Sequence, residues 1–198
     1  SPMWFSNLFG AFFAWGGFLS AVSVTTIIAV LHRNYPGMEG QITKARLHDL
    51  GKMIFAFSIF WMYLFWSQYL VIWYGNIPEE TEFVAARLGS EFLQDTWYFE
   101  GFWTRINEPY ARTTLVTWTL LWGLPFWVLL GARPKKSPAI LGAGATGSVF
   151  GFWLERYILV TPSLVPPVDV IAGADPSPFG WIAIGVSLGF LGLFMLSF

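Results

Sequence analysis

One apolar stretch of the sequence carries polar side chains at spacings that suit proton transfer. It begins with His48-Asp49-Leu50-Gly51-Lys52 and continues without another charge to Gly75-Asn76-Ile77-Pro78. In an α-helix, steps of about 100° per residue place the polar residues of this stretch within one arc of about 100°. They are His48, Asp49, Lys52, Tyr63, Ser67 and Tyr74. Histidine titrates near neutral pH and hydroxyl groups can relay protons, so we predict a proton path along this face, entered at His48.

The same polar face has a simpler interpretation. Tyr63, Ser67 and Tyr74 could bond to neighbouring helices, while the three charged or titratable residues before them mark a helix start at the membrane surface. Both interpretations keep the face away from lipid, because a polar group without a partner in hydrocarbon costs several kcal/mol. The sequence leaves the two open and predicts that the face contacts protein or water.

A second pair of charges lies inside another apolar stretch. Glu155 and Arg156 shortly precede Pro162, which places them roughly 10 Å from the end of their helix. Ionisable residues at that depth are rare and costly. In one reading Glu155, with Arg156 beside it, belongs to the proton path as its outer station, or Glu155 borders a quinone pocket. In the other, Arg156 extends to the outer surface and Glu155 pairs with an arginine such as Arg112.

The composition is that of a membrane protein. Of 198 residues, 55% are hydrophobic and only 12% are charged, which is far more apolar than a soluble domain. The absence of cysteine excludes thiolate-held iron–sulfur clusters and covalently attached haem. The two histidines, His32 and His48, are predicted at the same membrane face and so cannot hold a haem inside the bilayer. We therefore expect no redox centre, metal or other cofactor bound by this chain.

Five apolar stretches are long enough to cross a membrane, at about 20 residues per span. They cover about 4–31, 50–74, 113–130, 138–161 and 179–198. The third contains Pro125, which should kink the helix or interrupt its hydrogen bonds. The fourth has a glycine-rich face suited to close helix packing, formed by Gly142, Gly144, Gly147 and Gly151. The pattern predicts an all-α membrane protein with a single transmembrane domain over residues 1–198.

The charges of the loops predict an orientation. Basic residues collect on one side, at Arg33, Lys44, Arg46, Lys52, Arg133, Lys135 and Lys136. Acidic residues predominate in the loop 75–111 on the other side. Since basic loops favour the cytoplasm, the start of the chain is predicted outside and its end inside. Pro78, followed by Glu79 and Glu80, predicts a short helix at the start of the acidic loop.

Several motifs resemble one family of membrane proteins. They are Trp4-Phe5-Ser6-Asn7-Leu8-Phe9-Gly10, His48-Asp49-Leu50-Gly51-Lys52, Ser67-Gln68-Tyr69 and Trp73-Tyr74-Gly75-Asn76-Ile77-Pro78-Glu79-Glu80-Thr81. These stretches resemble the ActF-type membrane subunit of bacterial alternative complex III, which is similar to the NrfD/polysulfide-reductase membrane subunits. The chain resembles the C-terminal half of that subunit. The resemblance implies a four-helix bundle with one peripheral helix and a long acidic periplasmic loop in the bacterial inner (cytoplasmic) membrane, with the N-terminal end of the chain periplasmic and its C-terminus cytoplasmic.

The resemblance also implies a function. Complexes of this kind are quinol:electron-acceptor oxidoreductases, which take electrons from menaquinol or ubiquinol and pass them to a periplasmic cytochrome c or small copper protein. The redox centres would belong to periplasmic iron–sulfur and haem c subunits, alongside an NrfD-like sister membrane subunit. This chain would contribute a proton path, and whether it also contacts the quinone stays open.

Individual residues take roles by the same resemblance. The group His48, Asp49 and Lys52 looks like the cytoplasmic entry of the proton path, with Tyr63 and Ser67 further inside. Glu155 looks like the acid near the outer end of a bundle helix. The family pattern has a histidine four residues before the proline of the third span, where this sequence has Leu121. That departure removes one side chain from any relay.

Two other functions fit the sequence. As a scaffold, the chain would dock the redox subunits through its acidic loop and pack its glycine-lined faces against the sister subunit. An independent transporter would normally show inverted repeats or helices broken near mid-membrane. Pro125 is the one feature that hints at such a break.

Overall fold

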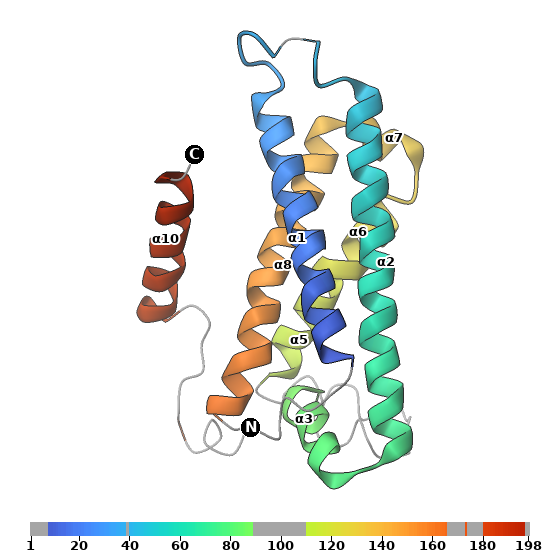
Figure 1. Cartoon of the computed structure of the whole chain (residues 1–198), viewed down its shortest axis with the longest axis vertical. Helices are drawn as coiled ribbons and strands as arrows, with labels where there is room; N and C mark the ends of the chain where they lie inside the picture. Colours follow the sequence, from blue (N-terminus) through green and yellow to red (C-terminus); the bar gives the residue numbers. More distant parts are fainter. Residues whose placement is uncertain (1–7, 39, 89–109, 166–172, 174–179, 197–198) are drawn as a thin grey trace.

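The computed structural model describes residues 8–38, 40–88, 110–165, 173 and 180–196 (Figure 1). Three long helices, α1 (Phe9–His32), α2 (Lys44–Gly75) and α8 (Pro138–Leu164), lie side by side along the long axis of the molecule. The shorter elements are α3 (Pro78–Leu88), α5 (Ala111–Trp118), the π-helix η3 (Thr119–Gly123), α6 (Leu124–Val128), α7 (Ala132–Lys136) and α10 (Trp181–Leu196). The described residues contain no strand, which confirms the prediction of an all-helical chain over this part.

Two of the helices are suited to crossing a membrane. By length and composition, α1 and α2 are apolar enough to do so, with 24 and 32 residues. The helix α10 is a shorter apolar helix of 16 residues, none of which is buried. It is joined to α8 by a hydrogen bond of 2.9 Å from Trp153 Nε1 to Ser187 Oγ. A helix that is apolar all round and not covered by protein suits a lipid environment.

The third predicted span is interrupted just before its proline. Instead of one helix over 113–130, the chain forms α5, a π-helical turn at Thr119–Gly123 and then α6. Pro125 has no N–H to donate, and the wider turn before it carries the chain past the missing hydrogen bond. The predicted interruption is therefore present, in the form of a π-helical turn.

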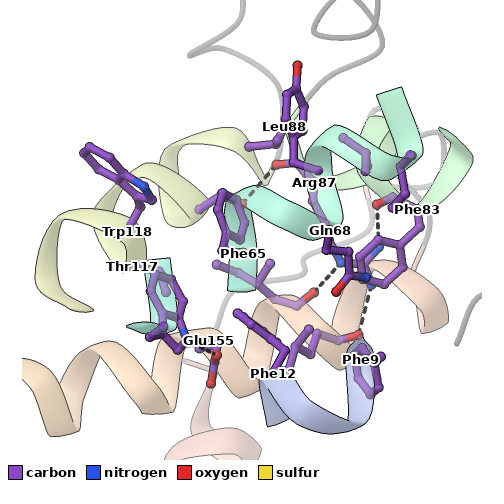
Figure 2. A pocket seen from close by; sticks show the side chains of 17 residues that line it. Phe9, Phe12, Phe65, Gln68, Phe83, Arg87, Leu88, Thr117, Trp118 and Glu155 are labelled. Carbon is purple, nitrogen blue, oxygen red and sulfur yellow. Dashed lines mark hydrogen bonds between the residues drawn. The ribbon is translucent and has the colours of Figure 1, made fainter. Parts of the chain in front are cut away.

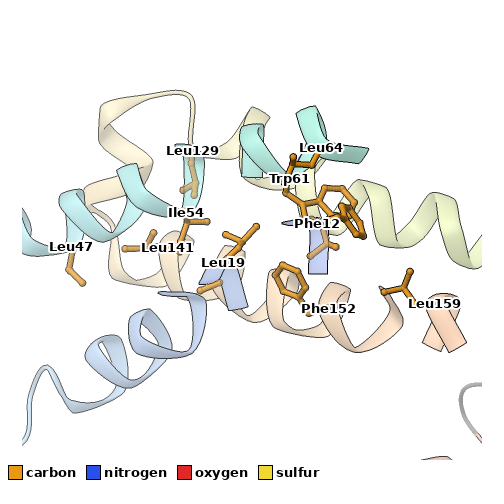
Figure 3. Packing of buried hydrophobic residues seen from close by; sticks show 12 residues of the cluster. Phe12, Leu19, Leu47, Ile54, Trp61, Leu64, Leu129, Leu141, Phe152 and Leu159 are labelled. Carbon is orange, nitrogen blue, oxygen red and sulfur yellow. The ribbon is translucent and has the colours of Figure 1, made fainter. Parts of the chain in front are cut away.

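The core is formed where α1, α2 and α8 meet the interrupted helix. Its buried side chains include Leu19, Ile54, Trp61, Leu141 and Phe152 (Figure 3). Close approach depends on glycine at Gly151, where an added Cβ would lie 2.9 Å from both Leu120 Cβ and Leu121 Cδ2. The glycine-rich face predicted on the fourth span thus lets α8 pack directly on η3.

The short helix predicted after Pro78 is observed as α3. Residues 89–109, which make up most of the predicted acidic loop, lie outside the described residues. The same holds for the beginning of the first predicted span, at residues 4–7, and for the ends of the last, at residues 179 and 197–198. The structure therefore describes the acidic loop only at its two ends.

Candidate functional site

A cavity of about 90 Å³ lies beneath α3, at the end of the molecule where α2 meets α3 (Figure 2). Side chains of α1, α2, α3, α5 and α8 line it. Its lining is almost entirely apolar, and the residues that bring polar groups to it are Gln68, Arg87, Thr114, Thr117 and Glu155. Apolar walls with a few convergent polar groups are typical of ligand and proton-exchange sites.

Glu155 is the buried acid of this cavity. It lies on α8 with 3% of its surface exposed. Its Oε1 accepts a hydrogen bond of 2.9 Å from Trp61 Nε1 on α2. Its Oε2 accepts no hydrogen bond from any described residue, and the nearest cationic atom is Arg156 Nη2 at 3.5 Å. A carboxyl group with so few donors around it is costly to bury as an anion.

Arg156 turns away from the cavity towards α1. Its Nη2 donates to the carbonyl oxygen of Phe13 at 3.3 Å, and its Cζ lies 3.8 Å from the centre of the Phe13 ring. Gly16 makes room for this arrangement, because an added Cβ there would lie 3.1 Å from Arg156 Nη2 and 3.5 Å from Glu155 Oε2. The side chain of Arg156 is still 33% exposed, so its pairing with Glu155 is partly open to the surroundings.

Arg87 connects α3 to α8 through hydrogen bonds. Its Nε donates to Ile158 O at 3.1 Å, and its Nη2 donates to Leu159 O at 3.0 Å and to Ser163 Oγ at 3.3 Å. Its Nη1 donates to Phe83 O at 2.7 Å within α3. Burial lowers the pKa of Arg87 to about 10, so the guanidinium remains charged at neutral pH. No carboxylate among the described residues forms an ion pair with it.

The sequence of α8 explains why Arg87 binds there. Pro162 lies inside the helix and has no N–H, so the carbonyl of Ile158, four residues earlier, loses its helical donor. A buried carbonyl needs a partner, and Arg87 Nε supplies it. On the other side of α3, Thr114 Oγ1 of α5 donates to Arg87 O at 3.0 Å. Arg87 therefore joins α3, α5 and α8.

The residues predicted to form a proton path on α2 lie outside this cavity. Asp49 and Lys52 form an exposed ion pair of 2.7 Å, and Tyr63 and Tyr74 are 60% and 78% exposed. Ser67 is half-buried on the same face. Trp61, which contacts Glu155, lies two residues from Tyr63 and so about 160° around the helix from it. Within the described chain the polar face of α2 thus points outward, and it is not brought together with Glu155.

His48 differs from its neighbours on this face. It is half-buried, and its Nδ1 is buried without a hydrogen-bond partner among the described residues. No group of three or more His, Cys, Asp or Glu residues in the described part could hold a metal ion. His48 is therefore a titratable group without a metal-binding set around it.

Sequence reasoning found Glu155 but missed the residues around it. Trp61, Arg87 and Gln68 were not predicted to lie around it. The one available signal was Pro162, which implies a carbonyl in need of a donor without identifying that donor.

No family model matches the chain, and no curated protein matches it either.

Proposed function

We propose that this chain is an integral membrane subunit of a quinol-oxidising electron-transport complex, in which Glu155 takes up and releases protons. Partner subunits would carry the iron–sulfur clusters and haem c, and menaquinol or ubiquinol would supply the electrons. The motifs around His48 and Trp73 resemble the ActF-type subunit, and the apolar helices α1 and α2 are consistent with a membrane location. A bacterial inner membrane is the corresponding location.

The observation that carries the proposal is the environment of Glu155. An acid that served only to hold helices together would have its oxygens satisfied by donors. Here one oxygen has Trp61 and the other has no hydrogen bond within the described residues. The carboxyl group also lines a cavity, a space that can hold water or a ligand beside it. A buried ionisable group of this kind in a membrane helix is by default a functional candidate.

The described helices also support a proposed membrane topology. We propose five spans, formed by α1, α2, the interrupted helix α5–η3–α6, α8 and α10. The basic residues Lys44, Lys135 and Lys136 would then lie at the cytoplasmic end, and α3 at the periplasmic end. The cavity and Glu155 would lie near the periplasmic surface, where protons from quinol oxidation are released.

The polar face of α2 has a place in the same proposal. Tyr63 is exposed on α2, about 21 Å along the helix axis from Asp49. Lipid would leave its hydroxyl without a partner, so we assign this face to the contact with an NrfD-like sister subunit. A proton path entered at His48 would then run between two subunits and not inside this chain.

A second candidate function is that of a scaffold. It is favoured by the same outward-facing polar residues on α2, which suit a subunit contact without any proton transfer. In that case the outer loop docks partner subunits and Glu155 is a structural acid, whereas the glycine face of α8 already packs inside this chain, against η3, α6 and α1. An independent transporter is less favoured, because the described helices show one interruption, at η3, next to Pro125.

The test uses the assembled complex in its native membrane. Glu155→Gln keeps the shape of the side chain and removes its proton exchange, so proton translocation coupled to quinol turnover should fall at least about tenfold. The matched control is Glu82→Gln, the same change at an exposed position of α3, which should leave coupling unchanged. Unchanged coupling in Glu155→Gln would leave only the scaffold. A scaffold predicts that Tyr63→Ala dissociates the complex while Glu155→Gln is silent.

A further inference from the structure

The cavity lies between Glu155 on α8 and the helix α3. Figure 2 shows Glu155 on one side of the cavity and three residues of α3, Phe83, Arg87 and Leu88, on another. Val84 of the same helix completes that wall and is 6% exposed. The helix α3 therefore covers one side of the cavity, and its displacement would widen the access to the carboxyl group of Glu155.

We infer that α3 is a gate over this cavity, that it controls the access of water and protons to Glu155, and that Arg87 is the latch that holds it closed. The role of the gate rests on the proposed function of Glu155, whereas its existence and its latch do not. By gate we mean the helix Pro78–Leu88, and by latch the hydrogen bonds of Arg87 to α5 and α8.

The helix α3 is too short to hold its position without help. It has 11 residues, and isolated helices of that length are marginal in water. Its apolar attachment is formed by Val84, which packs with Tyr69 and Ile72 of α2, and by Phe83, which also packs against the main core cluster. The remaining attachment is polar: Arg87 donates to Ile158 and Leu159, and Thr114 donates to Arg87 O. Charge-assisted hydrogen bonds of this kind are roughly twice as strong as neutral ones.

The connection between α2 and α3 is built to allow movement. Asn76 ends α2 in the left-handed conformation with φ 45°, and the residues from Gly75 to Ile77 are exposed. No side chain is buried in this short link, so a change of its backbone angles disturbs no packing. A link of a few exposed residues beside glycine is a typical hinge.

The cavity is large enough to be hydrated when the gate opens. A cavity of about 90 Å³ has room for several water molecules. Its apolar lining does not retain water by itself, but the polar side chain of Gln68 lines the same cavity as Glu155. Waters held between these two side chains would bring protons to the carboxyl group.

The absence of cysteine makes a direct test possible. In the full chain, Thr117→Cys places one thiol in the cavity wall, where the residue is 4% exposed. N-ethylmaleimide should label it slowly while Arg87 is present. In the Arg87→Gln background the labelling rate should rise at least about tenfold, because the closed state loses its charged hydrogen bonds. The matched control is Tyr74→Cys, which is 78% exposed and should be labelled at one rate in both backgrounds.

Two results would overturn the inference. One is a Thr117→Cys rate as fast as that of Tyr74→Cys in the presence of Arg87, which would mean that the cavity is already open. The other is a slow Thr117→Cys rate that Arg87→Gln does not change. If Arg87→Gln does not fold, Thr114→Val removes one hydrogen bond of the latch and should give a smaller rise. The labelling needs neither quinol nor partner subunits, so its failure is distinguishable from failure of the Glu155→Gln test.

Discussion

Arg87 Nε donates to the carbonyl oxygen of Ile158 at 3.1 Å, taking the place of the N–H that Pro162 lacks. A side chain from an earlier helix thereby completes the hydrogen bonding of α8 at its proline. This relationship makes the two residues, Arg87 and Pro162, energetically dependent on each other.

The dependence predicts the outcome of a double-mutant cycle. Arg87→Gln alone should lower the free energy of unfolding by about 1.5–3 kcal/mol, because buried carbonyls lose a charged donor. Pro162→Ala supplies a backbone N–H to Ile158, so in that background the loss should be smaller by about 0.5–1.5 kcal/mol. Unfolding of the chain in mixed detergent micelles measures both values. Strict additivity would show that the two residues do not share this carbonyl.

Close packing at Gly151 predicts a steep size limit. Gly151→Ala should cost about 1–3 kcal/mol, because the new methyl group meets Leu120 Cβ at 2.9 Å, an atom attached directly to the backbone. Gly147→Ala is the matched control on the same helix, where the nearest atom, Leu120 Cδ2, lies at 3.8 Å. It should be neutral or stabilise by up to about 1 kcal/mol. Thermal unfolding in detergent compares the two, and equal losses would contradict the observed packing.

The Trp61 indole is predicted to matter for Glu155. Trp61→Phe removes the donor at 2.9 Å and should lower the free energy of unfolding by about 1–3 kcal/mol. In a Glu155→Leu background the same change should cost less, because no acceptor is then left without its donor. Trp127→Phe, at a position that is 70% exposed, is the control and should be close to neutral. An equal cost of Trp61→Phe in both backgrounds would assign its effect to packing alone.

The outward polar face of α2 predicts different behaviour in isolation and in a complex. Tyr63→Phe removes one exposed hydroxyl group and should leave the thermal unfolding of the isolated chain unchanged. In the assembled complex it should weaken retention of the chain by about 0.5–2 kcal/mol, the range for hydrogen bonds between membrane helices. Co-purification at increasing detergent concentration measures this. Equal retention of both forms would argue against a subunit contact at Tyr63.

The long apolar helices and the short helix after Pro78 were predictable because each depends on local sequence. The run from Lys44 to Gly75 has no helix breaker in its interior other than isolated glycine, and Pro78 with its acidic neighbours suits a first helical turn. The interruption near Pro125 was also predictable. Its form as a π-helical turn was not, because that depends on how the segment packs against Gly151.

The candidate site was only partly predictable. Glu155 was identified because a carboxyl group deep in an apolar stretch is unusual. Its donor Trp61 is 94 residues away in the chain, and Arg87 reaches α8 across more than 70 residues, so local patterns could not reveal either contact. The helical wheel placed Tyr63 and Tyr74 on one face of α2. It could not show that this face points away from α1 and α8, which requires the positions of those helices.

The π-helical turn at Thr119–Gly123 has a consequence for how this segment tolerates changes in length. The turn takes up one residue more than an ordinary α-helical turn, which sets the rotation of α6 relative to α5. Deleting a single residue there would restore an ordinary α-helical turn, and because the wide turn absorbs the extra residue, the side chains after it would keep nearly their present direction about the axis. Pro125 and Leu129, both hidden from solvent now, would then stay close to their present neighbours. Shortening by one position is thus expected to be less harmful in this stretch than inside a regular helix such as α8, where the loss of one residue turns every later side chain by about 100°.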